Sequence, residues 1–292
     1  MKVMVFDVGG TEIKYSVMDE QLHRFDAGSV PTPQDTQKNF LDALYALYAP
    51  RRNEVCGIAM ALPGFVDTHT GYVSNGGALL YNTGTQVGRL VRETCGCPVT
   101  LENDGKAAAI AELRAGALQG CCNAAVFIIG TGVGGGIIAN GQLVRGVHFT
   151  AGEYSFVNTN AEAWDAPDQN MACQCSTRNL LIWYRARKAL PENAPLDGRS
   201  FFAAANAGEP EALEVLRRFC HAVAVQIFNL TVLLDVEKVA IGGGISKQPL
   251  LLESLRSAYD GLYASRAGQA YMEGLPRCQI VPCAFSSEAN QV

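Results

Sequence analysis

Short apolar runs alternate with amphipathic segments along most of the chain. β-branched and apolar residues dominate residues 2–6 and 125–129, and such runs are typical of buried strands; another strand is expected at 236–240. Residues 36–48 and 211–233 instead carry apolar side chains at helical spacing, and 211–233 is expected to be a central buried helix. Further strands are expected at 13–19, 55–62 and 98–101, and further helices at 86–95 and 106–118. This alternation predicts an α/β protein with mixed sheets.

The first glycine-rich turn has the sequence D-V-G-G-T at residues 7–11. A strand is expected on each side of it, so the turn would form the tip of a hairpin. Gly9 and Gly10 have no Cβ to cover their backbone N–H groups, and such groups can form a nest that binds phosphate. Thr11 adds a hydroxyl donor, and Asp7 is suited to face a magnesium ion. An ordinary hairpin turn explains the same residues.

The second glycine-rich turn, G-T-G-V-G-G-G at residues 130–136, contains a G-x-G-x-x-G match. A dinucleotide-binding fold would require a helix directly after these glycines. Here the apolar pair 137–138 and the hairpin signal Asn140-Gly141 follow, so the context is strand–turn–strand. The run therefore predicts a second phosphate-type hairpin like the first. Two such hairpins suggest two related half-structures that face each other across a nucleotide.

Length, charge and cysteine content narrow the class of protein. At 292 residues the chain allows one large domain or two ordinary ones, and its net charge of -5 argues against a general nucleic-acid or membrane-surface binder. No signal peptide or membrane span is expected, because the chain enters a strand within two residues and no apolar window is long enough. The ten cysteines are therefore expected to be reduced thiols in a cytoplasmic protein.

Asp104 ends the sequence E-N-D, which follows an expected strand and precedes an expected helix. An Asp at such a position is typically an N-cap that accepts hydrogen bonds from the first free N–H groups. Ligands of α/β folds bind at the carboxyl ends of strands, so Asp104 is also a candidate catalytic base. Both roles can be filled if Asn103 caps the helix while Asp104 projects into a cleft.

Taken in order, these segments resemble the ROK family of sugar kinases and repressors, a branch of the hexokinase–actin superfamily. The resemblance covers nearly the whole chain and rests on six motifs. They are D-V-G-G-T-E-I-K at 7–14, L-P-G at 62–64, E-N-D followed by A-A-A and E within 102–112, the glycine run 130–136, R-G with A-G-E within 145–153, and I-G-G-G-I-S at 241–246. Each motif alone is weak, but six in order form a specific pattern.

The resemblance implies a two-domain actin-like ATPase (ribonuclease H-like) fold with a nucleotide and sugar cleft between the domains. The N-terminal α/β domain would comprise residues 1–105 plus 284–292, and the C-terminal α/β domain residues 106–283. Residues 286–292 resemble the first turns of the helix that ends family members. Closure of the cleft on sugar binding is expected by analogy.

The implied activity is ATP-dependent phosphorylation of a sugar hydroxyl, a phosphotransfer to an alcohol acceptor, with ATP and Mg²⁺ as cofactors. Asp104 would be the base, and Asn103, Glu153 and the backbone at Gly64 and Gly77 would bind the sugar. Asp7 would lie near Mg²⁺, directly or through water. The ATP-binding residues would be Gly9, Gly10, Thr11, Lys14, Gly130, Thr131, Gly132, Gly243 and Gly244. Of these, Lys14 is explained equally well as a solvated strand lysine.

The chain departs from the pattern of many family members at their structural zinc site. In those members a His stands three residues after A-G-E and joins a C-x-C…C cluster. Here Phe156 stands at the place of the His and Leu180 at that of the last Cys, while Cys173 and Cys175 remain. Two thiolates fall short of the four ligands of structural zinc, so no zinc is expected. Nearby His148 is interpreted as a loop or substrate-pocket residue.

The sugar pocket is also expected to differ, because Ile182 stands where a sugar-binding carboxylate usually follows the zinc cluster. The loop at 76–81 resembles that of zinc-free, short members that include β-glucoside kinases. We therefore expect glucose, N-acetylmannosamine or a β-glucoside as substrate, no nucleic-acid or membrane partner, and consider a homodimer. A repressor would need a helix-turn-helix ahead of the hairpin at residue 7. A catalytically silent, regulatory sugar-binding protein is the remaining alternative.

Overall fold

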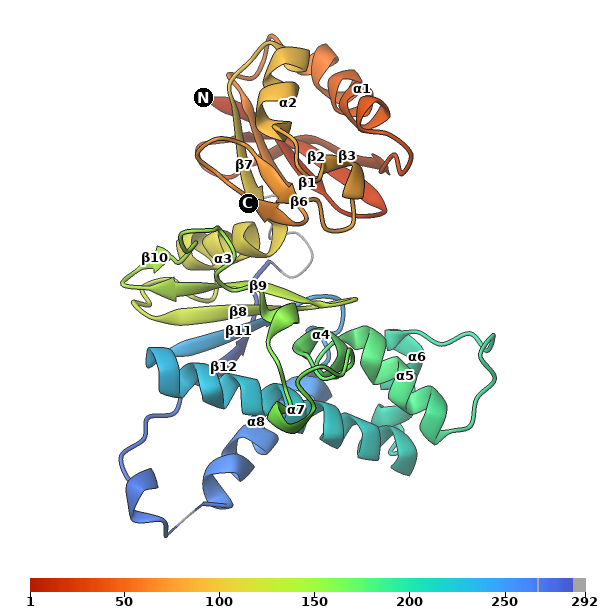
Figure 1. The fold of residues 1–292 in the computed structure, drawn as a ribbon, viewed down its shortest axis with the longest axis vertical. Helices are drawn as coiled ribbons and strands as arrows, with labels where there is room; N and C mark the ends of the chain where they lie inside the picture. The colour runs from red at the N-terminus through yellow and green to blue at the C-terminus, as the bar shows by residue number, and fades with distance from the viewer. Residues whose placement is uncertain (267, 286–292) are drawn as a thin grey trace. The chain divides into compact units, whose positions relative to one another are not determined.

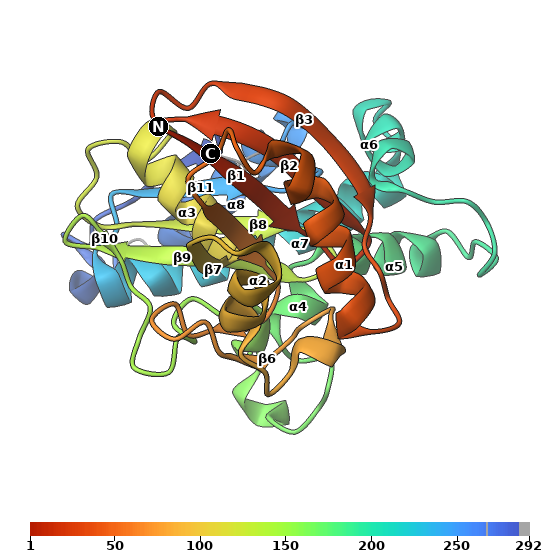
Figure 2. The same ribbon diagram turned by 90° about the horizontal axis from the view of Figure 1, so that it is seen from above.

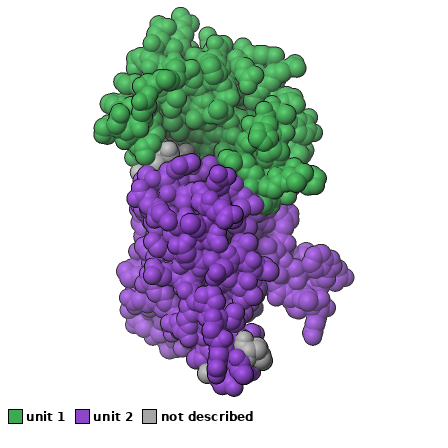
Figure 3. All heavy atoms as spheres, turned by 90° about the vertical axis from the view of Figure 1, so that its left-hand side faces the viewer, with its two compact units in different colours: residues 1–108, 145–151, 288–292 green, residues 109–144, 152–287 purple. Residues whose placement is uncertain are grey.

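The computed structural model describes residues 1–266 and 268–285. Figure 1 and Figure 2 show the ribbon, and Figure 3 shows the division into two compact units. Of the described residues, unit 1 contains 1–108 and 145–151, and unit 2 contains 109–144 and 152–285. The helix expected at 286–292 lies outside the described residues. No helix in the described part of the chain has the length and apolar character of a membrane span.

Unit 1 is built on a five-stranded sheet in the order β3-β2-β1-β4-β7. The first three strands are antiparallel neighbours, whereas β1, β4 and β7 run parallel. The strands are β1 (Lys2–Val8), β2 (Glu12–Asp19), β3 (Arg24–Pro31), β4 (Ile58–Leu62) and β7 (Val99–Asn103). A small separate sheet pairs β5 (Phe65–Val66) with β6 (Val73–Asn75).

One face of the unit 1 sheet forms the hydrophobic core of this unit. Phe6, Met60 and Leu101 pack there against α1 (Gln37–Tyr48) and α2 (Val87–Cys95). Helix α1 begins where the sequence predicts, because the Thr36 hydroxyl accepts a hydrogen bond from the Asn39 N–H. Helix α2 ends at a left-handed glycine, which is the common way to stop a helix.

Unit 2 contains a second five-stranded sheet in the order β10-β9-β8-β11-β12. Its strands are β8 (Ala124–Ile129), β9 (Val133–Ala139), β10 (Gln142–Leu143), β11 (Lys238–Gly242) and β12 (Gln279–Pro282). The pairing repeats that of unit 1, with two antiparallel steps followed by two parallel ones. The expectation of two related half-structures is therefore confirmed at the level of topology.

Helices cover both faces of the unit 2 sheet. On one face Phe127, Val239 and Ile280 join a core that includes residues of α5 to α8, as Figure 1 shows. On the other face Val126 and Ala240 pack with residues that include Ala109 of α3. The helices are α3 (Asp104–Ala115), α4 (Met171–Gln174), α5 (Thr177–Arg187), α6 (Gly198–Asn206), α7 (Pro210–Leu234) and α8 (Pro249–Ala264), with 3₁₀ turns at Ala49–Arg51, Leu80–Asn82, Tyr154–Phe156, Ala161–Ala163 and Ala270–Met272.

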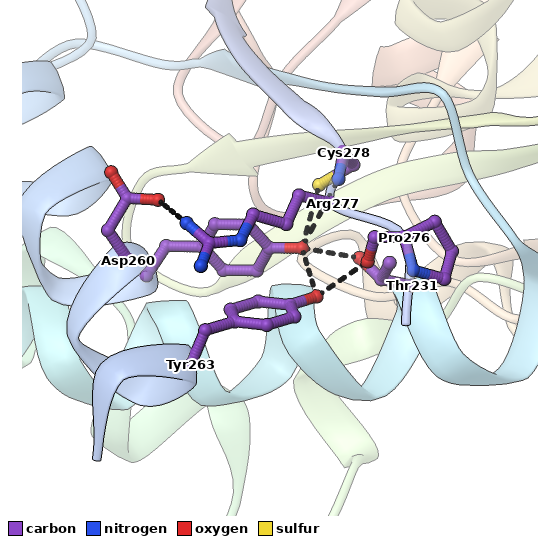
Figure 4. A network of polar contacts seen from close by, with 7 residues as sticks. Thr231, Asp260, Tyr263, Pro276, Arg277 and Cys278 are labelled. Atoms are coloured by element: carbon purple, nitrogen blue, oxygen red, sulfur yellow. Dashed lines mark hydrogen bonds and ion pairs between the residues drawn. The ribbon is translucent and has the colours of Figure 1, made fainter. Parts of the chain in front are cut away.

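Helix α7 is the buried helix that the sequence predicts, and it contacts α5, α6 and α8. A hydrogen-bonded network joins it to α8 (Figure 4). The Tyr259 hydroxyl lies 3.1 Å from the hydroxyls of both Thr231 and Tyr263, and Tyr263 donates to the Pro276 carbonyl at 2.8 Å. Burial raises the pKa of Tyr259 well above its usual range. The three hydroxyls of this network are thus satisfied by one another and by the Pro276 carbonyl.

Several element boundaries differ from those that the sequence predicts. Strand β4 begins at Ile58 instead of residue 55, and α3 begins at Asp104 instead of residue 106. Strand β9 begins at Val133, so the last three glycines of the run 130–136 lie within a strand and not in the turn. The apolar pattern does not predict strand β3, because the residues of this strand are mostly exposed and show no apolar alternation.

Glu112 of α3 has a fully buried side chain, with 0% exposure. Its carboxylate accepts hydrogen bonds from the backbone N–H groups of Ala117 at 2.8 Å, Ala284 at 3.0 Å and Phe285 at 3.0 Å. Hydrogen bonds to a charged acceptor are stronger than neutral ones, and buried donors are costly to leave unpaired. One carboxylate therefore ties the segment after β12 to α3.

We expect Glu112→Ala to lower the free energy of unfolding by about 3 kcal/mol or more, because three backbone N–H groups lose their hydrogen-bond acceptor. Glu112→Gln keeps one acceptor oxygen and should cost less. Urea unfolding followed by circular dichroism measures both changes. Glu253→Ala, an exposed position on α8, is the matched control and should change stability by less than about 0.5 kcal/mol. A Glu112→Ala protein as stable as this control would contradict the assignment.

Candidate active site

A row of charged side chains crosses the unit 1 sheet where its parallel strands end. The strand register places Lys14 beside Asp7, Asp7 beside Ala61, and Ala61 beside Glu102. Side chains at paired positions share one face of a sheet, and this face is opposite the core. The Lys14 ammonium lies 3.9 Å from the Asp7 carboxylate. Open α/β sheets bind ligands at this end of their strands.

The first glycine turn is fixed by residues that follow β3. The turn closes through Gly9, whose N–H donates to the Glu12 carbonyl at 2.9 Å. Thr32 donates its hydroxyl to the Gly9 carbonyl at 2.8 Å and its N–H to the Thr11 carbonyl at 3.0 Å. Gln34 donates to the Gly10 carbonyl at 2.5 Å. The sequence motifs do not indicate Thr32 and Gln34, because the role of these residues depends on the pairing of β3.

Asn103 joins the predicted sugar loop to the start of α3. Its amide nitrogen donates to the Gly64 carbonyl at 2.9 Å, and its amide oxygen accepts from the Lys106 N–H at 3.0 Å. Gly64 has φ +98°, and a Cβ there would lie 1.9 Å from the Asn75 carbonyl oxygen, so only glycine fits. A Cβ on Gly77 would lie 3.0 Å from the Gly64 nitrogen. The structure thus brings these predicted sugar-binding residues together.

Asp104 is the first residue of α3 and directly follows the end of β7. The N-cap of this helix is Asn103, so the interpretation of Asp104 itself as the cap is wrong. The Asp104 carboxylate is half-buried, and one of its oxygens lies 2.7 Å from the Gly105 nitrogen. Two residues later, the Lys106 side chain is only 1% exposed. A buried ammonium is normally paired, and the sequence motifs indicate no role for Lys106.

Residues 145–151 belong to unit 1, although they follow β10 in the chain. Arg145 places Nε 2.9 Å and Nη2 2.7 Å from one carboxylate oxygen of Glu102. Such charge-assisted contacts are among the stronger hydrogen bonds in proteins. Since Glu102 immediately precedes Asn103 and Asp104, the ion pair fixes this segment beside the candidate base. The spacing of the motifs gave no signal for this pair.

The second glycine turn lies in unit 2 and is held by two segments far away in the chain. It closes through Gly130, whose N–H donates to the Gly132 carbonyl at 3.0 Å. The Ser155 hydroxyl accepts from the Val133 N–H at 3.0 Å, and the Thr177 N–H at the start of α5 donates to the Gly130 carbonyl at 2.9 Å. Like Thr11 in the first turn, Thr131 is exposed at the tip of its turn.

Glu153 lies in a segment that is packed tightly on β9. Gly135 has φ +142°, and a Cβ there would come within 1.8 Å of a β8 carbonyl oxygen and 3.0 Å of the Tyr154 ring. The Tyr154 hydroxyl donates to the Gly136 carbonyl at 3.1 Å, and burial raises the pKa of this phenol far above its usual range. Gly152 lies against Gly136, where an added Cβ would be 3.3 Å from its Cα. The backbone on both sides of Glu153 is therefore fixed.

The predicted adenosine loop follows β11 and meets the end of β8. Gly243 has φ +95°, and a Cβ there would lie 2.1 Å from the Ile129 carbonyl oxygen. Gly244 has no atom within 4 Å of an added Cβ, so it faces open space. A Cβ on Gly198, at the start of α6, would lie 3.2 Å from Ile245. Gly243 therefore satisfies a steric requirement next to the second glycine turn, whereas Gly244 does not.

No group of three or more His, Cys, Asp or Glu side chains suited to a metal ion occurs among the described residues. Of the two cysteines in C-x-C, Cys175 is buried in the unit 2 core, and burial raises the pKa of its thiol to about 12. The Cys173 thiol lies 3.7 Å from the Pro167 carbonyl. Cys175 is therefore a packing residue at the C-terminal end of α4.

This chain is similar to known sugar-binding and sugar-phosphorylating proteins in both sequence and structure. The β-glucoside kinase of Klebsiella pneumoniae is 31% identical over 261 residues, which cover 88% of this chain and 86% of that protein. A ROK family protein of Streptococcus pneumoniae, solved in complex with sucrose, superposes with a TM-score of 0.86 at 29% identity and covers 100% of this chain and 95% of that one. A ROK family glucokinase of Streptomyces griseus, solved with glucose and AMPPNP, gives 0.82 at 26% identity, with 100% and 97% coverage.

These similarities confirm the predicted fold class. A family model described as "ROK family" matches residues 3–279, which is nearly the whole described chain. The chain belongs to the ROK family.

Proposed function

We propose that this protein is an ATP-dependent kinase that phosphorylates a hydroxyl of a hexose or of a hexose-containing sugar. The observation that carries the proposal is the arrangement at the start of α3, where Asn103 binds Gly64 and caps the helix that begins with Asp104. The related proteins named as a β-glucoside kinase and a glucokinase support the same activity. Glucose, N-acetylmannosamine and β-glucosides are the candidate substrates.

Asp104 is the proposed general base. It lies at the carboxyl end of β7, beside the loop that contains Gly64 and Gly77. In phosphoryl transfer the protein mainly positions the reactants, and a carboxylate accepts the proton of the attacking hydroxyl. A positioned base of this kind accelerates reactions by roughly 10²–10⁴-fold. Asn103, Glu153 and the backbone at Gly64 and Gly77 are proposed to hold the sugar hydroxyls.

The two glycine turns are the proposed phosphate-binding elements, and the loop at 243–244 the adenosine-binding element. Each turn has an exposed threonine at its tip and a backbone fixed by neighbouring segments. Preorganised N–H groups stabilise phosphate charge because they need no rearrangement during the reaction. The Asp7 carboxylate, beside Lys14, fits the oxygen ligands that Mg²⁺ prefers, directly or through water. Bound to the phosphates, this ion neutralises their charge.

Two replacements favour a second candidate function, a catalytically silent sugar-binding protein. Phe156 is 70% exposed and Ile182 is 49% exposed, at positions where the family resemblance expects a histidine and a carboxylate. Loss of the zinc-site histidine and of the sugar-binding carboxylate would weaken or shift sugar binding without touching Asp104. The kinase remains the better proposal, because the backbone of both glycine turns is fixed by hydrogen bonds and Asp104 begins α3 beside Asn103.

The decisive measurement is ADP release with ATP, Mg²⁺ and a panel of glucose, N-acetylmannosamine, mannose, fructose and cellobiose. We expect turnover on at least one sugar, and Asp104→Asn should lower kcat by about 10²–10⁴-fold, the contribution of a general base. Sugar affinity from calorimetry should stay within several-fold, because the Asn side chain keeps the shape of Asp.

Asp165→Asn, at an exposed position of unit 2, is the matched control and should leave kcat unchanged. If Asp104→Asn turned over as fast as the wild type, Asp104 would not be the base. If the wild-type protein bound a sugar but turned over none, the silent sugar-binding function would replace the kinase.

Gly132→Ala tests the second glycine turn. A Cβ at this position would lie 2.9 Å from the Ser155 hydroxyl, which bonds the Val133 N–H, so the turn must shift. We expect the KM for ATP to rise about tenfold, equivalent to 1.4 kcal/mol of lost binding. Gly261→Ala, where an added Cβ meets nothing within 4 Å, is the control. An unchanged KM for ATP would remove this turn from the ATP site.

A further inference from the structure

Two aromatic side chains meet on the surface of unit 1, outside its core. The rings of His69 and Phe149 lie 5.5 Å apart at 72°, in an edge-to-face arrangement. His69 is exposed and Phe149 is half-buried, and neither belongs to the hydrophobic core of this unit. They come from two different loops, at 67–72 and 145–151. Aromatic side chains that solvent can reach are suited to bind the apolar face of a ring.

The backbone at Phe149 is strained, which a merely solvent-exposed loop would not require. Its φ of +60° lies in the left-handed region, which bulky residues rarely adopt. Gly146 in the same loop has φ +74°, where glycine is at no disadvantage. The conformation of this loop therefore brings the Phe149 ring to His69 at an energetic cost.

The loop is anchored next to the proposed base. The Ala151 N–H donates to the Arg145 carbonyl at 3.2 Å, so the two ends of the loop are held together. Arg145 in turn pairs with Glu102, which precedes Asn103 in β7. These contacts all lie within unit 1, so the position of Phe149 is fixed with respect to the start of α3.

His69 is anchored on the other side, in the hairpin that begins at Gly64. One Asp67 carboxylate oxygen accepts from the His69 N–H at 2.8 Å and from the Thr70 N–H at 3.2 Å, which fixes the tip of the hairpin. His69 is five residues from Gly64, so their Cα atoms are no more than about 17 Å apart. The chain thus limits how far the aromatic pair can lie from the loop that is proposed to bind the sugar.

We propose that His69 and Phe149 form a second subsite, which binds the ring attached to the phosphorylated hexose and selects glycosides over free hexoses. The inference rests on the proposed kinase function and specifies its substrate class, a β-glucoside with a sugar or aryl group as the second ring. The relative named as a β-glucoside kinase and the ROK structure with sucrose support an enlarged site of this kind.

The test compares kcat/KM for cellobiose with kcat/KM for glucose in each variant. Phe149→Asn removes the ring but keeps a residue that tolerates φ > 0, and His69→Ala removes the other ring. For each variant we expect the cellobiose-to-glucose ratio to fall about five- to tenfold, the range of one aromatic contact. Val147→Ala, in the same loop and 89% exposed, is the matched control and should leave the ratio unchanged.

An unchanged ratio in Phe149→Asn and His69→Ala would overturn the subsite. An equal loss for both sugars would also overturn it, because the pair would then support the loop and not a second ring. Failure of the wild type to phosphorylate any sugar would instead contradict the proposed function. In that case calorimetry decides the subsite, which predicts that cellobiose binds more tightly than glucose and that Phe149→Asn removes the difference.

Discussion

The organisation of unit 1 depends on the two hydrogen bonds of one amide, that of Asn103. Its oxygen satisfies a backbone donor at the start of α3, and its nitrogen holds the carbonyl of Gly64. An amide is suited to this position because it offers a donor and an acceptor at once, which a carboxylate or a hydrocarbon does not. Asp104 is therefore spared the capping role, and it begins α3 directly after the carboxyl end of β7.

The same plan of construction recurs in unit 2 with other residues. Each unit has a hairpin that begins at the first strand of its parallel set, and each hairpin turn is held by side chains or backbone from a later segment. Glycine is required at Gly64, Gly135 and Gly243 because a Cβ would overlap a carbonyl oxygen at 1.8 to 2.1 Å. Close backbone approach, and not flexibility, explains these glycines.

Much of this architecture could be predicted from the sequence, because the apolar runs and glycine turns are local signals. The hairpins, α1, α2 and α7 follow from pattern and capping residues. The ion pair of Arg145 with Glu102 could not, since it joins residues 43 positions apart. Neither could the contact of His69 with Phe149, which depends on a left-handed residue that no local pattern indicates. Long-range side-chain pairing is the information that one sequence does not display.

The buried carboxylate of Glu112 has a consequence for how this protein can vary. All three of its donors are main-chain N–H groups, which every residue except proline provides. Substitutions at positions 117, 284 and 285 to residues other than proline therefore preserve the hydrogen bonds to Glu112. Only the loss of Glu112 itself removes all three hydrogen bonds. The sequence of the neighbouring segments can therefore vary as long as Glu112 is retained.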